Sequence, residues 1–474
     1  MLNTRPTYEN GLFVPTHVPG RPVVSSPFPM LRTLALLPGI ARNPLSGFAE
    51  TQYEDPVSKY PLFGKKFALV NDPALIRHIF VTKADSLKKE QLSQKILRYA
   101  LRDGMLTAEG ETWRKARRAI TPMFSPRHVA GFGDAMVQTA QSFVEELRAG
   151  SDRIELAPAM SKLAFLILSE TLFSGEINEE GEQILADTAI FLEKLGQPDP
   201  LDLMNMPDWL PRVTRLTGHS SSGRLRAIVR RAAEDRRARM EAGEAVPDDF
   251  LTLLLSAGED DATRLTLDEI EDNVLTFVAA GHETTARAVT WTLYCLSFDA
   301  DALARARGEA DALDMSLPAR EWGRALPWIT ACFEEGMRLF PPAAVILREL
   351  QEDISFNGYE LEKGRNAYIS QWVLHRHKTL WENPNAFDPE RMFGENRKRI
   401  DRFAYLPFGL GPRVCIGASF AMQEAHVMLA TLLRAFDFSY GGMEMPRPVM
   451  RITVQPDNGM PMRLRERDER RRAA

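Results

Sequence analysis

The chain has 474 residues, of which 44% are hydrophobic and 26% are charged, and its formal net charge is −5. These values are typical of a soluble globular protein, and the acidic balance excludes a general affinity for nucleic acid. Three cysteines are too few for a disulfide framework and indicate a reducing compartment. The first twenty residues hold no apolar run long enough for a signal peptide, so we expect a cytoplasmic protein.

Residues 1–72 are expected to form an N-terminal segment with a small β region, because "GKKFALV" is a strand-like run. The apolar stretch "LRTLALLPGIA" in this segment is too short to span a bilayer and contains a proline. No transmembrane segment is therefore expected. A buried helix is the main interpretation of residues 30–41, and a weak contact with a membrane surface is the alternative.

Helical periodicity dominates residues 73–350. Within this region "HSSSG" at 219–223 lies between two helical patterns and predicts a connection between helices. Thr266 and Glu269 form a capping box at the start of a proline-free helical pattern. The pattern predicts a central helix over residues 267–298, which at 1.5 Å per residue is about 48 Å long.

The middle of this central helix reads "FVAAGHETTARAVTW" and groups poor helix formers in a helix interior. Threonine hydroxyls in such a position can bond to the preceding turn and distort the helix. One face is small and apolar apart from a single hydroxyl, and it consists of Phe277, Ala280, Gly281, Thr284 and Ala288. A bulky ligand can lie against such a face, although a tolerated polar kink in a core helix is the alternative.

The C-terminal region, residues 351–474, contains a hairpin signal at Asn357-Gly358, a glycine-rich cysteine segment, a final helix and a charged tail. The segment "FGLGPRVCIG" at 408–417 places Cys415 directly before an amphipathic helical pattern. The N–H groups and dipole of a helix N-terminus stabilise a thiolate. The glycines also allow a flat ligand to approach the backbone closely.

Three functions are compatible with a lone thiolate in this setting. Zinc requires further Cys or His ligands at short spacing, and no C-x-x-C is present. A cysteine hydrolase requires a histidine base, and none of the eight histidines lies in a recognisable catalytic motif. An axial haem ligand requires only one cysteine. His375 and His377 suggest a metal site, but two solvated histidines are favoured because no third ligand is evident, and Cys295 and Cys332 are predicted to lie in the core.

The cysteine segment resembles the cysteine loop of the cytochrome P-450 family, of the soluble bacterial type. The pattern F-x-x-G-x-R-x-C-x-G is matched in full, by Phe408, Gly411, Arg413, Cys415 and Gly417. Four further family motifs occur in the family's order. They are W-x-x-x-R with Trp113 and Arg117, "AGHETT" at 280–285, E-x-x-R with Glu335 and Arg338, and "FDPERM" with Arg391.

This resemblance implies a mainly α cytochrome P-450 fold in one domain over residues 1–474. A large helical domain with small β-sheets would hold haem b between the central helix and the cysteine loop. Cys415 would be the axial ligand of the haem iron. The other cofactor-binding residues implied are Trp113, Arg117, Arg348, Arg413, Phe408, Gly411, Gly417 and Ala280. Glu335, Arg338 and Arg391 would form a structural triad that braces the cysteine loop.

The implied activity is that of a monooxygenase, which inserts one oxygen atom of O2 into a hydrophobic organic substrate. Glu283 and Thr284 would be the catalytic pair that delivers protons. The substrate pocket would be lined by Phe277, Ala280, Thr284, Ala343, Ala344, Val345 and Ile346. The stretch 88–106, with Ile96, Leu97 and Leu101, would cover this pocket. A haem sensor or carrier without turnover, and a non-haem cysteine hydrolase, are the alternatives.

The electron source implied is a separate partner, because the chain ends soon after Cys415. The resemblance implies a ferredoxin or flavodoxin with its NAD(P)H reductase. Arg114, Lys115 and Arg118 lie beside Trp113 and can supply a basic docking face, although an ordinary charged helix face is the alternative. We expect the protein to be a monomer.

Overall fold

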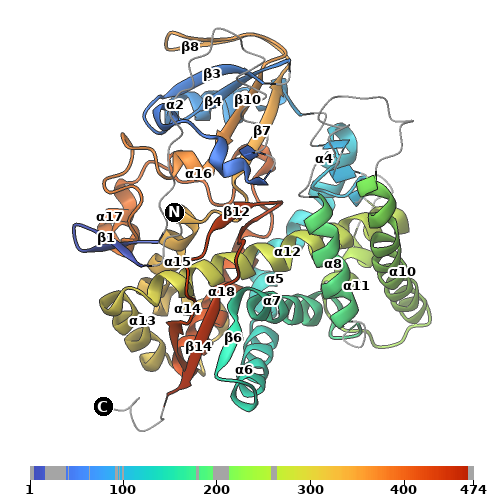
Figure 1. The fold of residues 1–474 in the computed structure, drawn as a ribbon. Coiled ribbons are helices and arrows are strands. Elements are labelled where there is room, and N and C mark those ends of the chain that lie inside the picture. Colours follow the sequence, from blue (N-terminus) through green and yellow to red (C-terminus); the bar gives the residue numbers. More distant parts are fainter. Residues whose placement is uncertain are drawn as a thin grey trace.

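The computed structural model describes residues 5–15, 39–40, 42–62, 64–90, 94–95, 97–98, 101–177, 181–195, 213–257 and 264–467. Helices fill most of the molecule, and a five-stranded sheet lies at one end of it (Figure 1). The expectation of a mainly helical fold with small sheets is confirmed.

The helices lie in three groups along the chain. Before residue 200 they are α2 (Pro73–Arg77), α4 (Gly110–Ile120), α5 (Pro126–Gly131), α6 (Gly133–Ala149), α7 (Leu156–Phe173) and α8 (Gly181–Leu195). The middle group consists of α10 (Val213–Glu241), α11 (Phe250–Ser256), α12 (Leu267–Leu296), α13 (Ala300–Ala312), α14 (Ala319–Ala325) and α15 (Pro327–Leu339). The last group consists of α16 (Gln371–Leu374), α17 (Gly394–Arg399) and α18 (Ala418–Ala435).

The helix α12 is the predicted central helix, and it crosses the molecule in Figure 1. The Thr266 hydroxyl accepts a hydrogen bond from the backbone N–H of Glu269 at 3.2 Å, and the Glu269 carboxylate accepts one from the N–H of Thr266 at 2.8 Å. This reciprocal cap satisfies two N–H groups that a helix start leaves unpaired. The predicted start at residue 267 is confirmed, and the helix ends at Leu296, two residues before the predicted end.

The helix α12 packs against α7, α15 and α18 and has most of its residues in the main core. Among the described helices, α7 alone is long and apolar enough to cross a membrane by length and composition. Two thirds of it (67%) is buried inside the molecule, which is the pattern of a core helix. The expected membrane-surface segment, residues 30–41, lies mostly outside the described residues.

The predicted connection at 219–223 is wrong, because α10 runs through these residues without a break. Serine costs only a few tenths of a kcal/mol in a helix relative to alanine, so tertiary contacts outweigh it. Directly after this stretch, Arg224 pairs with Asp187 of α8. Two residues later, Arg226 pairs with Glu271 and Asp272 of α12 at 2.6 and 2.8 Å. These ion pairs fix α10 against its neighbours.

The described strands form one five-stranded sheet and four smaller sheets. The large sheet has the order β3 (Val57–Leu62), β4 (Lys65–Val70), β10 (Asn366–Ser370), β7 (Val345–Leu350) and β5 (Leu87–Lys89). The others are β1 (Thr7–Glu9) with β2 (Leu12–Val14), β8 (Ile354–Phe356) with β9 (Tyr359–Leu361), β12 (Pro448–Met450) with β13 (Val454–Pro456), and β11 (Phe436–Tyr440), β14 (Pro461–Glu466) and β6 (Arg153–Glu155).

Strand pairing in these sheets positions one tight turn and places two like charges opposite each other. Asn357 and Gly358 have φ values of 47° and 82° and join β8 to β9, which confirms the predicted hairpin. In the large sheet, the antiparallel pairing of β5 with β7 places Lys89 directly opposite Arg348. Like charges in opposite positions on adjacent strands repel each other. This edge of the sheet is therefore a site where an anion would be stabilising.

Glu424 of α18 is a buried carboxyl group inside the helical part of the molecule. It is 1% exposed, and neither of its oxygens has a hydrogen-bond partner in the part of the chain that the structure describes. Burial raises the pKa of Glu424 to about 8, while the nearby Thr285 hydroxyl of α12, which does not reach it in hydrogen-bonding geometry, lowers the pKa slightly. The folded protein therefore holds this carboxyl group in its neutral form at neutral pH.

The state of Glu424 predicts a specific pH dependence of stability. Between pH 4.5 and 8 the folded state keeps a proton that the unfolded chain releases. Stability should therefore fall as pH rises through this window, by about 1.4 kcal/mol per pH unit for this one group. In Glu424→Gln this contribution should be absent, so urea unfolding at pH 6 and pH 8 should show a smaller loss. The exposed Glu145→Gln is the control, and equal pH dependence in all three proteins would contradict the prediction.

Candidate haem and active site

The cysteine loop, residues 408–417, is folded tightly before α18. The Cys415 N–H donates a hydrogen bond to the Phe408 carbonyl oxygen at 2.8 Å. Gly411 has a φ of 67°, and a Cβ atom there would lie 2.4 Å from the Phe80 carbonyl oxygen, so glycine is required. Gly417 precedes α18 with an ordinary φ of −85°, and a Cβ atom there would make only a van der Waals contact with Phe124. The loop thus demands glycine at 411 but not at 417.

The Cys415 side chain is exposed, whereas Cys295 and Cys332 are buried, as the sequence predicted for those two. Protein atoms nevertheless lie around Cys415, and this burial raises the pKa of its thiol. The Gly417 N–H and the Arg117 guanidinium lower this pKa by less. The net direction is therefore upward, although a helix N-terminus was expected to lower the pKa of this thiol. A thiol that is both accessible and enclosed faces a space inside the fold.

The same pattern occurs in the middle of α12. Ala280 is exposed and Thr284 half-buried, although most of this helix is buried. The Thr284 hydroxyl donates to the Ala280 carbonyl oxygen at 2.8 Å. The predicted face is only partly accessible, because Ala288 is buried and a Cβ atom at Gly281 would contact Leu168 of α7 at 3.4 Å. Phe277 is 9% exposed and belongs to the core.

Side chains from three elements join the cysteine loop to α12 and β7. The Phe124 ring packs edge-on against the Phe277 ring of α12, with the centroids 5.4 Å apart. Phe124 also lies beside Gly417, and the Ile346 side chain of β7 lies beside Gly409. The loop, α12 and β7 therefore surround one region. In the predicted pocket segment Ala343 is exposed and Val345 and Ile346 are half-buried, but Ala344 is 2% exposed and lies in the core.

Cations gather at one edge of this region. Lys89 of β5 faces Arg348 across the sheet, and burial together with Arg413 and Arg348 lowers the pKa of Lys89 to about 7. Burial also lowers the pKa of Arg413, to about 10, with Arg348 and Arg117 adding to the effect. The single acid in this group is Glu109, which pairs with Arg413 at 2.9 Å and with Lys89 at 3.9 Å. Lys89 and Arg413 thus share one carboxylate.

Arg348 is the least compensated member of the cation group. Its guanidinium donates to the Leu347 carbonyl oxygen at 2.7 Å, and no acidic side chain in the described ranges lies within ion-pair distance of it. Burial lowers the pKa of Arg348. Arg413 is better held, because it also donates to the Ala108 carbonyl oxygen and stacks on the Trp113 ring at 3.9 Å. The predicted residues Trp113, Arg348 and Arg413 are therefore brought together.

Glu283 and Thr284 are neighbours on α12 but have different surroundings. Glu283 is buried, and its Oε1 accepts hydrogen bonds from Arg287 at 3.1 Å and from Thr453 at 3.0 Å. Its Oε2 is buried and has no hydrogen-bond partner among the residues described. The Glu283 carboxylate is therefore enclosed by protein. It is held between α12 and the hairpin of β12 and β13.

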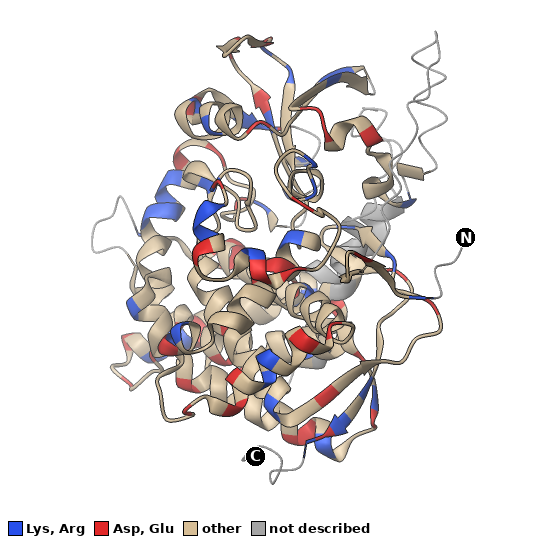
Figure 2. Ribbon diagram, turned by 90° about the vertical axis from the view of Figure 1, so that its left-hand side faces the viewer, with Lys and Arg blue, Asp and Glu red and all other residues tan. Residues whose placement is uncertain are grey.

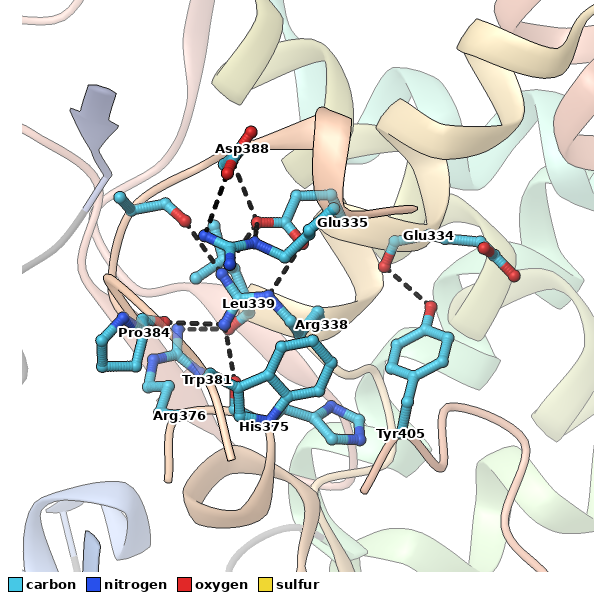
Figure 3. Close-up of polar contacts among 12 residues, drawn as sticks. Glu334, Glu335, Arg338, Leu339, His375, Arg376, Trp381, Pro384, Asp388 and Tyr405 are labelled. Atoms are coloured by element: carbon cyan, nitrogen blue, oxygen red, sulfur yellow. Dashed lines mark hydrogen bonds and ion pairs between the residues drawn. The ribbon is translucent and has the colours of Figure 1, made fainter. Parts of the chain in front are cut away.

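The three residues of the predicted triad are in contact, and Figure 3 shows Glu335 and Arg338 among their polar contacts. Arg338 donates two hydrogen bonds of 2.8 Å to Glu335, and Arg391 donates one of 3.1 Å to the same carboxylate. Arg338 also binds the carbonyl oxygens of His375, Pro384 and Ala386. Glu335 and Arg338 are fully buried, so each charge depends on the other.

The two histidines beside the triad are buried, so the interpretation as solvated histidines is wrong. His375 is fully buried, and its Nε2 accepts a hydrogen bond from the Leu406 N–H at 2.9 Å. His377 is 2% exposed and bonds to the Asp55 carbonyl oxygen and to Thr379. No group of three metal-binding side chains occurs within the described ranges. His375 is instead a structural link between the triad and the segment before the cysteine loop.

The proposed basic docking face on α4 is weaker than the sequence suggested. Lys115 pairs with Glu269 of α12 at 2.8 Å, and Arg114 pairs with Glu111 at 3.3 Å. Arg118 is exposed. Basic and acidic residues are interspersed along the ribbon in Figure 2.

Sequence reasoning missed Lys89, Glu109 and Thr453. Lys89 lies within the stretch 88–106 that was expected to cover the pocket. Its role depends on the strand register, which places it opposite Arg348. Glu109 lies four residues before Trp113, and it pairs with Arg413, which is far away in the sequence. No sequence signal marks Thr453. Of the expected covering residues, Leu101 is buried, Leu97 is half-buried and Ile96 lies outside the described residues.

Comparisons with known proteins agree on the family. A model of the family "Cytochrome P450" matches residues 22–461. The chain is 28% identical to human cytochrome P450 4Z1 over 465 residues, which is 91% of each chain. It is 27% identical to a cytokinin hydroxylase of Arabidopsis thaliana, over 86% of this chain and 82% of the relative. The crystal structure of the cytochrome P450DA haem domain is similar, with a TM-score of 0.77 at 25% identity, covering 88% of this chain and 91% of the other.

These relatives give no support to the soluble bacterial type that the motifs suggested, since the two sequences compared are plant and human proteins. They do support the predicted fold, cofactor and reaction class. The chain belongs to the cytochrome P450 family and is a monooxygenase that uses haem b, O2, a hydrophobic substrate and a redox partner.

Proposed function

We propose that this monooxygenase hydroxylates a hydrophobic organic compound at the region enclosed by the cysteine loop, α12 and β7, with Cys415 as the axial haem ligand. The observation that carries the proposal is the accessible but enclosed thiol of Cys415. Coordination to a metal ion deprotonates a thiol outright, so the raised pKa of the thiol is no obstacle. When bound, haem with a thiolate ligand supplies the chemistry that cleaves the O–O bond.

The residues present fit haem b. Its two propionates are anions, and Lys89, Arg348 and Arg413 form a cationic group that shares only Glu109. Charge-assisted hydrogen bonds to such anions would offset the repulsion between Lys89 and Arg348. Trp113 stacks against Arg413 of this group, and Arg117 lies close enough to Cys415 to interact with it electrostatically. The surfaces against the two faces of the haem would come from Phe408, Gly411 and Gly417 of the cysteine loop and from Ala280 of α12.

Glu283 and Thr284 are proposed to move protons. The half-buried Thr284 hydroxyl lies beside the exposed Ala280, where a small molecule can reach it. Its own proton is directed at the Ala280 carbonyl oxygen at 2.8 Å, so its lone pairs can accept a hydrogen bond from water. Glu283 is the adjacent acid and would supply protons to this point.

The substrate class follows from the accessible surface. Ala280, Ala343, Val345 and Ile346 are accessible or partly so, and all are apolar. An apolar pocket with one hydroxyl group favours a hydrophobic compound over a charged one. A ferredoxin or flavodoxin as electron donor, a cytoplasmic location, a monomeric state and a single domain over residues 1–474 are part of the same proposal.

Replacement of Cys415 tests the ligand assignment. The dithionite-reduced, CO-treated wild-type protein should show the absorption band of a haem-thiolate. Cys415→Ser should lose this band, whereas Cys332→Ser should keep it, because Cys332 is buried in the core. A Cys415→Ser protein that keeps the wild-type band would overturn the assignment.

Replacement of Arg348 or Lys89 tests the propionate site. Without haem, Arg348→Met should raise the urea midpoint, because it removes repulsion from Lys89. With haem, the same change should weaken binding, and transfer of haem to apomyoglobin should be about fivefold to tenfold faster for the loss of one charge-assisted bond. Lys89→Met should act in the same two directions. Lys83→Met, which removes an exposed lysine paired with Glu352, is the control. Equal haem transfer from all four proteins would contradict the site.

Replacement of Thr284 tests its role at the reacting centre. Thr284→Ala should keep the haem spectrum and the rate of NAD(P)H oxidation within severalfold, but it should divert electrons from product to hydrogen peroxide. The Thr284→Ser variant retains a hydroxyl group and should be close to wild type. A peroxide yield per NAD(P)H that is unchanged in Thr284→Ala would exclude Thr284 from proton delivery.

A further inference from the structure

The acid of the proposed proton path, Glu283, is held from two directions. Along α12, Arg287 donates to its Oε1 at 3.1 Å, and the two residues form an ion pair one turn apart. From the hairpin, the Thr453 hydroxyl donates to the same Oε1 at 3.0 Å. Both partners are enclosed: Thr453 is 3% exposed, and the Arg287 side chain is 15% exposed. One oxygen of the carboxylate thus takes both contacts.

The hairpin of β12 and β13 is itself fixed to α12. Gln455 accepts a hydrogen bond from Arg287 at 3.2 Å, and the Trp291 indole donates to the Val454 carbonyl oxygen at 3.1 Å. The Val454 N–H donates to the Pro342 carbonyl oxygen, next to Ala343 of the proposed pocket. The α12 residues that contact the hairpin, Glu283, Arg287 and Trp291, are spaced one helical turn apart and share one side of α12. These hydrogen bonds fix the position of the hairpin, and the hairpin places Thr453 beside Glu283.

The second oxygen of Glu283 is in a different state. Oε2 is buried and lacks a hydrogen-bond partner among the described residues. A buried polar atom without a partner costs about 1–3 kcal/mol, so such an atom calls for a functional reason. The side-chain hydroxyl and guanidinium donors on Oε1 leave Oε2 as the oxygen on which a proton can be placed.

We propose that Thr453 and Arg287 are positioning residues that hold Glu283 by Oε1 and leave Oε2 as its proton-carrying atom. This inference rests on the proposed role of Glu283 in proton delivery. A proton taken up at Oε2 from water converts the carboxylate to the acid, while Oε1 keeps accepting from Thr453 and Arg287. Release of that proton towards Thr284 restores the starting state, with no covalent bond in the protein skeleton changed and no electron transferred by Glu283.

The test compares Thr453→Val, which keeps the shape and removes the hydroxyl, with Thr453→Ser, which keeps the hydroxyl. O2 consumption is measured in H2O and in D2O with NADPH and a surrogate ferredoxin and ferredoxin reductase. If the acid loses its position, proton transfer becomes rate-limiting. Thr453→Val should then be about tenfold slower, since a displacement of about 1 Å at a reacting group can cost up to 100-fold, and its solvent isotope effect should rise. Thr453→Ser should restore both values.

Two controls separate positioning from folding. Thr431→Val removes another buried hydroxyl, which has no hydrogen-bond partner in the described part of the chain, and it should leave the rate and the isotope effect unchanged. Urea unfolding midpoints of Thr453→Val, Glu283→Gln and the double variant, measured without haem, should be non-additive, because the first change acts through the contact with Glu283. A variant that only lowered haem content would slow O2 consumption without changing the isotope effect.

The outcomes also distinguish this inference from the proposed function. Loss of the haem-thiolate band in the wild-type protein, or unaltered peroxide yield in Thr284→Ala, would overturn the proposed function itself. If both of those tests succeed but Thr453→Val keeps the wild-type isotope effect, or if the unfolding midpoints are additive, the positioning role of Thr453 is wrong and the proposed function stands.

Discussion

The buried carboxylate of Glu335 is the constraint on which the position of the segment before the cysteine loop depends. A carboxylate without solvent contact is stable only when cations and hydrogen-bond donors surround it. Arg338 and Arg391 provide these, and Arg338 also gathers carbonyl oxygens of the segment 375–386 (Figure 3). One of these oxygens belongs to His375, and the ring of His375 accepts a hydrogen bond from the Leu406 N–H. The segment before the cysteine loop is thus connected to the buried ion pair through His375.

On the opposite side, α12 serves both as a core element and as part of the site. Its flanks are buried against α7, α15 and α18, so its position is set by packing. After the first turn of α12, Ala280 is exposed and Thr284 is half-buried, whereas most other residues are buried. Because the Thr284 hydroxyl bonds to the Ala280 carbonyl oxygen, the poor helix formers do not break the helix. A rigid element can therefore present a polar group to a reacting molecule without moving.

The sequence predicted features that local chemistry determines. The start of α12 follows from the Thr266–Glu269 capping box, and the β8–β9 turn follows from Asn357-Gly358. Features that arise from distant pairing were not predictable. Lys89 becomes a site residue only because strand register places it opposite Arg348. His375 and His377 look solvated in a polar sequence, yet tertiary hydrogen bonds bury both. The serines of α10 likewise give a turn signal that ion pairs override.

Two buried carboxyl groups, Glu283 of α12 and Glu424 of α18, have opposite surroundings. Glu283 has a cation and a hydroxyl as partners, so it can carry charge within the protein. Glu424, on the helix that follows Cys415, has neither, and the pKa that burial raises to about 8 keeps it neutral near pH 7. Charges interact more strongly inside a protein than in water. A neutral Glu424 thus adds no negative charge to the helix that follows Cys415, so the Gly417 N–H and the Arg117 guanidinium would stabilise a thiolate there without opposition from this helix.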